Sequence, residues 1–163
     1  MTRMEVDEKS LVRLVAALRS EADGKELGRE LALELRAVAE PALQAARGAL
    51  MSMPSSTHDV PGLRSTVAAR TRISVRLSGK HPGVAIRASK AGMPRQFNNA
   101  PKRLNAAKGW RHTVFGDDSK WVTQLGMPGW FDDTIPRFKP AAQKAAKQAM
   151  DNMARRIDLK TRG

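Results

Sequence analysis

Two segments near the middle of the chain alternate apolar and polar residues with the two-residue period of a β-strand. In residues 71–77 the aliphatic side chains fall on one side, and residues 84–88 resume the alternation after a glycine-rich connection. Two such runs predict an antiparallel hairpin. Its aliphatic face would pack against helices, and its opposite face would carry Arg72, Arg76 and Arg87.

Apolar residues three and four positions apart predict helices before this hairpin. A short helix is expected over about residues 11–20, with Ser10 as its N-cap, and a long helix over about residues 25–50. Pro41 lies inside the second pattern, where it removes a backbone donor and clashes with the preceding turn. We therefore expect a kink or a break at this position.

The remaining chain predicts a second hairpin and a final helix. Residues 109–116 and 121–124 have the pattern of its strands, and the acidic segment 117–120 that of its turn. The final helix, capped by Asp133 or Thr134, is expected to reach about residue 157 ahead of a polar tail.

This order of elements predicts an α+β fold, with short antiparallel hairpins packed against a long N-terminal and a long C-terminal helix. A chain of 163 residues is expected to form a single domain with a substantial core. Its parts would be a helical N-terminal part, a basic β-hairpin region, and a C-terminal helix with its tail. These parts span residues 1–59, 60–124 and 125–163.

The positive charge is concentrated in the middle third of the chain. Residues 60–116 contain 12 Lys or Arg and no Asp or Glu, while residues 1–59 carry 8 basic and 10 acidic groups and residues 117–163 carry 9 and 6. Ordinary surfaces intersperse both signs, so this acid-free stretch indicates a polyanion or an acidic partner surface. A single strand arginine could equally serve only to protect a sheet edge. The candidates for contact with a polyanion or an acidic partner are Arg70, Arg72, Arg76, Lys80, Arg87 and Lys90.

No pattern of catalytic or metal-binding residues is present in the sequence. The chain has no Cys, so it has no disulfide, thiolate metal site or Cys nucleophile. The histidines are His58, His81 and His112, and none has a second His or a carboxylate at a metal-ligand spacing. There is also no phosphate-binding loop and no nucleophile elbow. We therefore expect no enzyme activity, no metal and no cofactor.

The few aromatic residues are expected to serve packing or subunit contact. Seven aromatic residues without a Tyr argue against a stacking platform for single-stranded nucleic acid. No apolar run approaches the roughly 18 residues of a membrane span. The tryptophans lie in or beside the second hairpin, and we interpret them as anchors rather than as a ligand site. The anchor candidates are Trp110, Arg111, His112, Phe115, Trp121, Trp130 and Phe131.

Three segments of this region resemble a known family. They are Gly109-Trp-Arg-His-Thr-Val-Phe-Gly116, Trp121-Val-Thr-Gln124 and Gly129-Trp-Phe131, ahead of an alanine-rich C-terminal helix. They are similar to the tail-completion or head–tail joining (neck) proteins of long-tailed double-stranded DNA bacteriophages, in the form found in actinobacterial phages. The family's usual form has Pro where this chain has Thr113. The signature is structural and contains no catalytic residue.

The resemblance implies a non-catalytic α+β subunit of the virion neck, assembled in the host cytoplasm. Such subunits form a ring around the DNA channel, between the connector or stopper on one side and the tail terminator or tail tube on the other. We expect a six-fold ring, with a twelve-fold ring as the alternative. Genomic double-stranded DNA would pass through it without sequence-specific contacts, and no membrane is involved.

Two other functions remain as alternatives. A sequence-independent double-stranded DNA-binding protein would also need an acid-free basic stretch, although the chain lacks a recognised DNA-binding motif. A small hydrolase has no supporting feature in the sequence. A DNA titration at several salt concentrations would separate the first alternative from the neck subunit.

Overall fold

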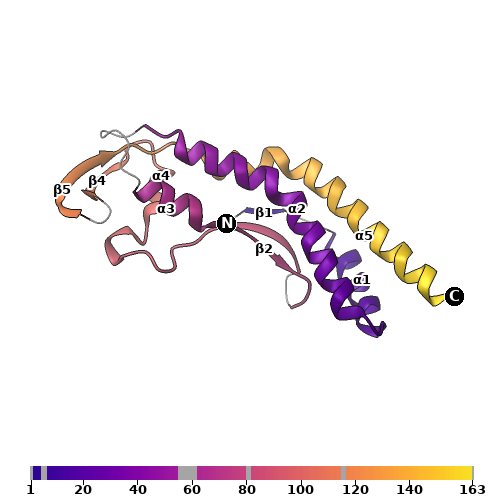
Figure 1. Ribbon diagram of the computed structural model, residues 1–163. Coiled ribbons are helices and arrows are strands. Elements are labelled where there is room, and N and C mark those ends of the chain that lie inside the picture. Colours follow the sequence, from indigo (N-terminus) through magenta and orange to yellow (C-terminus); the bar gives the residue numbers. More distant parts are fainter. Residues whose placement is uncertain (1, 5–6, 55–61, 80–81, 115–116, 163) are drawn as a thin grey trace. The chain divides into compact units, whose positions relative to one another are not determined.

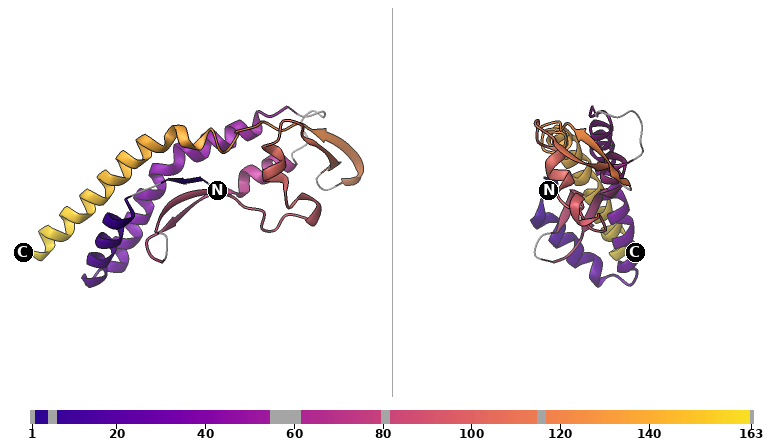
Figure 2. Two further views of the ribbon diagram at one scale, coloured as in Figure 1. Left: turned by 180° about the vertical axis from the view of Figure 1, so that it is seen from behind. Right: turned by 90° about the vertical axis from the view of Figure 1, so that its left-hand side faces the viewer.

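The protein has an α+β fold with two antiparallel hairpins and one long helix toward each end of the chain. The computed structural model describes residues 2–4, 7–54, 62–79, 82–114 and 117–162. Figure 1 labels the elements, and Figure 2 shows them from two further sides. In chain order they are β1 (Thr2–Met4), α1 (Glu8–Ser20), α2 (Gly24–Met51), α3 (Leu63–Arg70), β2 (Thr71–Arg76), β3 (Gly83–Ala88), η1 (Arg95–Phe97), α4 (Ala100–Leu104), β4 (Trp110–Val114), β5 (Asp117–Gln124), η2 (Ile135–Phe138) and α5 (Lys139–Thr161).

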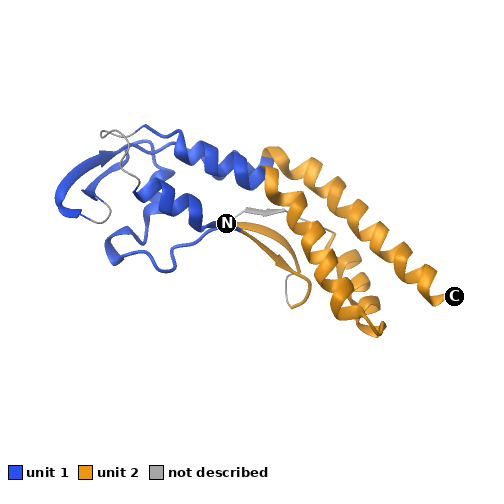
Figure 3. Ribbon diagram, viewed as in Figure 1, with its two compact units in different colours: residues 1, 42–72, 87–136 blue, residues 2–41, 73–86, 137–163 orange. Residues whose placement is uncertain are grey.

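The chain forms two compact units, which Figure 3 shows in different colours. Unit 1 contains residues 42–72 and 87–136, and unit 2 contains residues 2–41, 73–86 and 137–163. Each unit therefore combines segments that lie far apart in the sequence. The single domain expected over the whole chain stays a prediction.

Apolar stripes on three helices form the core of unit 2. The buried side chains include Leu11, Leu14 and Leu18 of α1, Leu27, Leu31 and Leu35 of α2, and Ala142, Ala146, Met153 and Ile157 of α5. The periodicity that predicted these helices is confirmed, and α1 packs against α5. In α5 the side chain of Ala146 is buried and that of its neighbour Ala145 is exposed.

Ion pairs connect α5 to the N-terminal end of α2 and the turn before it. Arg156 Nη1 lies 2.7 Å from Glu30 Oε2, and Lys160 pairs with Asp23. The hydrogen bond from Lys160, and then its charge, hold the pKa of Asp23 below its ordinary value. These pairs are exposed, so they help to orient the two helices more than they stabilise the unit.

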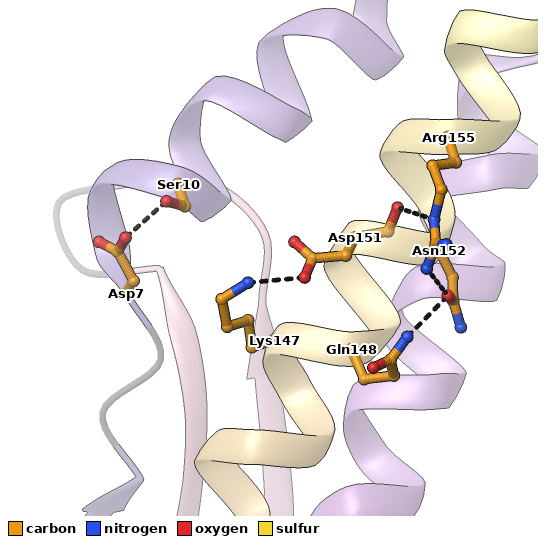
Figure 4. Close-up of polar contacts among 7 residues, drawn as sticks. All are labelled: Asp7, Ser10, Lys147, Gln148, Asp151, Asn152 and Arg155. Atoms are coloured by element: carbon orange, nitrogen blue, oxygen red, sulfur yellow. Dashed lines mark hydrogen bonds and ion pairs between the residues drawn. The ribbon is translucent and has the colours of Figure 1, made fainter.

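The outer face of α5 is a ladder of polar contacts within the helix (Figure 4). Lys147 Nζ donates to Asp151 Oδ2 over 2.7 Å, and Gln148 Nε2 donates to Asn152 Oδ1 over 3.0 Å. Arg155 donates to the same Asn152 oxygen over 2.8 Å. Pairs three and four residues apart support an exposed helix, so this face is stable in water without a partner.

The starts of two helices differ from the predictions. Asp7, not Ser10, is the N-cap of α1, because its carboxylate accepts the Lys9 N–H at 3.1 Å while the Ser10 hydroxyl donates to Asp7 (Figure 4). The last helix begins at Lys139, after the short helix η2. Pro140 explains this start, since its missing N–H is tolerated only in the first turn.

Other boundaries were also wrong. The acidic segment 117–120 belongs to strand β5 rather than to the turn, and the polar tail expected after residue 157 continues α5 to Thr161. The helix α2 continues through Pro41, so the break expected there is absent, while the alternative, a kink, stays a prediction. Strand β1 had no signal in the sequence, because its three residues are held by pairing with β3, in a sheet of order β1-β3-β2.

The leucine stripe of α2 allows a matched test of the core. We expect Leu35→Ala, at a site with 0% exposure, to lower the free energy of unfolding by about 2–5 kcal/mol, because it removes buried methyl groups and leaves a cavity. Leu33→Ala, at 65% exposure in the same helix, should change it by less than about 0.5 kcal/mol. Urea titrations followed by circular dichroism would measure both, and equal losses would contradict the assignment of the buried stripe.

Candidate anion-binding surface

Several arginines of unit 1 donate to backbone carbonyl groups. Arg64 donates to the carbonyls of Met51 and Met53, and Arg72 Nε donates to Ala69 O over 3.3 Å. The acid-free stretch offers no carboxylate nearby, so carbonyl oxygens accept these N–H groups instead. The bonds do not neutralise the guanidinium charge, and the positive potential of the region persists.

Arg70 has the most extensive contacts of this kind. Its guanidinium donates to the carbonyls of Ala91 and Gly92, while its own carbonyl accepts the Ser89 N–H at 3.1 Å. Gly92 has a φ of +70°, and a Cβ there would lie 2.9 Å from the Arg70 guanidinium. The positive φ favours glycine at this position. The bonds from Arg70 tie the segment after β3 to the end of α3.

A second group of basic side chains has no partner among the residues that the structure describes. Arg76 is exposed on β2, four residues after the exposed Arg72, so the two share the face expected from the alternation. Arg87 was expected on that open face but is half-buried at the end of β3. Lys90 is exposed, and Lys80 lies outside the described residues, as do His58, His81 and Phe115.

A pocket of about 540 Å³ in unit 1 brings free cations together. Its lining comes from the end of β3, the segment after it, α4 and the turn before η2. These residues are Arg87, Ala88, Ser89, Lys90, Pro101, Lys102, Asn105, Trp130, Phe131 and Asp132. Only Arg87, Lys90 and the aromatic pair at 130–131 were site candidates from the sequence. Lys102 and Asn105 were missed, because only folding brings α4 beside residues 130–132.

The anchor residues divide into buried and exposed groups. Trp130 and Phe131 are buried with ring centroids 5.3 Å apart. The buried ring of His112 lies 4.8 Å from that of the half-buried Trp110 and 5.4 Å from that of Phe97. These residues are therefore part of the packing of unit 1.

The other face of the β4–β5 hairpin carries an exposed aromatic–cation pair. The Arg111 guanidinium lies 5.5 Å from the Trp121 ring centroid, and Trp121 is 57% exposed. The register pairs Arg111 with Thr123 and Trp121 with Thr113, which places both side chains on one face. Tryptophan and arginine are enriched among the residues that contribute most to protein–protein binding, so this exposed pair indicates a subunit contact.

The described residues contain no group of three or more His, Asp or Glu placed to hold a metal ion. No helix in the described ranges is both long and apolar enough to cross a membrane. Hydrogen bonds from Ser119 lower the pKa of Asp117, and those from Ser10 lower the pKa of Asp7. These carboxyl groups lie outside the pocket, so their shifts concern local hydrogen bonding.

No model of a protein family matches this chain, and neither a curated protein nor a solved structure does. The phage neck resemblance of residues 109–131 therefore stays a prediction. What this surface can bind therefore has to be inferred from its charges and its shape. It combines exposed cations, a basic pocket and one exposed aromatic face.

Trp130 and Trp121 allow the core and contact roles to be separated. Trp130→Ala, at 1% exposure, should lower the free energy of unfolding by about 3–5 kcal/mol. Trp121→Ala should change it by less than about 0.5 kcal/mol, because the ring is mostly in solvent. Chemical denaturation would measure both variants. If Trp121→Ala lowered the free energy of unfolding as much as Trp130→Ala does, Trp121 could not serve surface contact alone.

Proposed function

We propose that this protein is a non-catalytic structural subunit of a bacteriophage neck, which assembles into a ring around the DNA channel where head and tail meet. The observation that carries the proposal is the segment 109–131. It contains the residues that resemble the neck family, and in this fold it forms the β4–β5 hairpin and the buried turn of unit 1. The aromatic residues of this segment that the structure describes therefore serve packing and contact, as a scaffold requires.

The distribution of charge supports passage of DNA rather than a tight grip on it. Attraction to phosphates is independent of base sequence and grows with the number of cations near the duplex. The side chains of Arg76 and Lys90 are exposed, and neither side chain has a hydrogen bond or ion pair to any residue in the described ranges. Flexible exposed cations attract a duplex and allow it to slide.

The exposed face of β4 and β5 supplies a surface for subunit contact. Trp121 and Arg111 lie on it together, and Leu125 is exposed just beyond the end of β5. A ring needs contacts between two different surfaces of the same subunit, repeated until the ring closes. The hairpin face is one such surface in this proposal, and a six-fold ring is the expected assembly.

Deletion of the protein tests the neck role directly. In a phage that encodes this chain, its loss should give filled heads and separate or unfinished tails, visible by electron microscopy, with infectivity restored by the wild-type chain. Trp121→Ala should fold normally but restore infectivity poorly, because it lacks the contact aromatic. Leu159→Ala, which shortens another mostly exposed apolar side chain outside the hairpin, is the matched control. Joined, infectious particles without the protein would exclude the role.

The acid-free stretch also favours a second candidate, a free protein that binds duplex DNA without sequence preference. We expect the purified protein to bind duplex DNA weakly and to release it at modest salt concentration. A neck subunit would contact DNA only at the high local concentration of an assembled ring, so it does not need a high affinity of its own. Fluorescence anisotropy at several salt concentrations would measure this, with the slope giving the number of released counterions. Tight binding at physiological salt with a steep slope would favour the second candidate instead.

A further inference from the structure

The basic pocket of unit 1 has more positive charge than its surroundings neutralise. Arg87, Lys90 and Lys102 all line it, and none of these side chains has a hydrogen bond or ion pair to a described residue. Asp132 is the one carboxylate in the lining, and it accepts a hydrogen bond from Asn105 Nδ2 at 3.2 Å. The pocket therefore has an excess of two positive charges that nothing in the described chain offsets.

The walls of the pocket are held in place by specific bonds. Arg70 binds the carbonyls of Ala91 and Gly92, which fixes the segment that carries Lys90. On the opposite side, Asn105 Oδ1 accepts the Gly129 N–H at 2.8 Å, so α4 is tied to the turn that carries Trp130. A preformed site loses less conformational entropy when a ligand binds.

Two lining residues also have buried donors without an acceptor. Arg87 Nε and Trp130 Nε1 are inaccessible to solvent and have no hydrogen-bond partner in the described part of the protein. A buried N–H group without an acceptor is unfavourable. An anion bound beside Arg87 would compensate the charge of the whole guanidinium group.

The lining combines these cations with apolar side chains. Ala88, Pro101, Trp130 and Phe131 form the apolar part. A duplex presents densely spaced phosphates and no apolar group that enters a pocket of this size. The carboxylate of Asp132 repels the densely spaced phosphates of a duplex more than it repels a single carboxylate of a peptide. A peptide that offers one carboxylate next to an apolar side chain fits both parts of the lining.

We propose that this pocket is a docking site for an acidic peptide segment of a partner protein, in which an Asp or Glu lies beside an apolar residue. The carboxylate binds between Arg87, Lys90 and Lys102, and the apolar side chain packs against the pocket's hydrophobic part. The site goes beyond the proposed neck role and does not require a ring. Its failure would leave that role intact, and the deletion experiment tests the role separately.

The test uses two peptides that differ only in the carboxylate. The probe is acetyl-Gly-Phe-Asp-Gly-amide, and its control is acetyl-Gly-Phe-Asn-Gly-amide. The readout is the indole N–H signal of Trp130 in a two-dimensional NMR spectrum of the full chain. Trp110→Phe and Trp121→Phe identify this signal, because each removes one of the other two indole signals. We expect the Asp peptide to shift it in a saturable way and the Asn peptide to leave it unchanged.

Charge-matched variants locate the binding site. Lys90→Gln and Lys102→Gln should each weaken the Asp peptide roughly tenfold, because a hydrogen bond to a charged group is lost. Both residues are exposed, so the fold should survive these changes. Lys108→Gln removes the same charge from the same acid-free stretch but outside the pocket, and should have no effect. Equal weakening in all three variants would indicate only a general field effect and overturn the site.

Four further results would overturn the proposal. One is no shift with the Asp peptide, and another is an equal shift with both peptides. The third is a shift of the Trp130 signal by short duplex DNA that Lys90→Gln and Lys102→Gln weaken, which would assign the pocket to nucleic acid. A shift that appears when the free protein alone is concentrated would assign it to a second copy of the chain, and would overturn the proposal too.

Discussion

The organisation of unit 1 depends on guanidinium groups that donate to backbone carbonyls. Arg47 of α2 donates to Ala68 O over 3.0 Å and to Thr71 O over 2.9 Å, at the junction where α3 ends and β2 begins. Arg70 in turn holds the segment that follows β3. A planar guanidinium has several donors in a fixed geometry, so it can hold two chain segments in a defined arrangement. In this way Arg64, Arg70 and Arg72 of the acid-free stretch donate to carbonyl groups in place of carboxylates.

This constraint separates the cations into two groups with different uses. Arg64, Arg70 and Arg72 maintain backbone geometry and add to the positive potential, whereas the side chains of Lys90 and Lys102 have no partner in the described residues. Charge that the fold does not use is available for binding. The proposed passage of DNA depends on the summed potential, and the proposed peptide site depends on the local convergence of a few side chains in one pocket.

The β4–β5 hairpin shows how one motif can serve both structure and contact. His112 and Trp110 face the packed side, where their rings contact one another, while Arg111 and Trp121 face solvent. The strand period of two makes this separation possible within a few residues. A family signature rich in aromatic and basic residues therefore need not indicate catalysis, because a scaffold uses the same residue types for its core and its surface.

Periodicity in the sequence determined the fold class, the long helices and both hairpins, because leucine stripes and alternating strands depend on neighbours a few residues away. The acid-free stretch was equally visible. Only tertiary structure decided that three residues at the N-terminus form β1 against β3, that Arg87 is half-buried, and that Lys102 meets Trp130 at a pocket. These features depend on contacts between segments tens of residues apart. Local sequence patterns carry no information about such contacts. The contacts contribute to the free energy of the protein only once folding has brought the distant segments together.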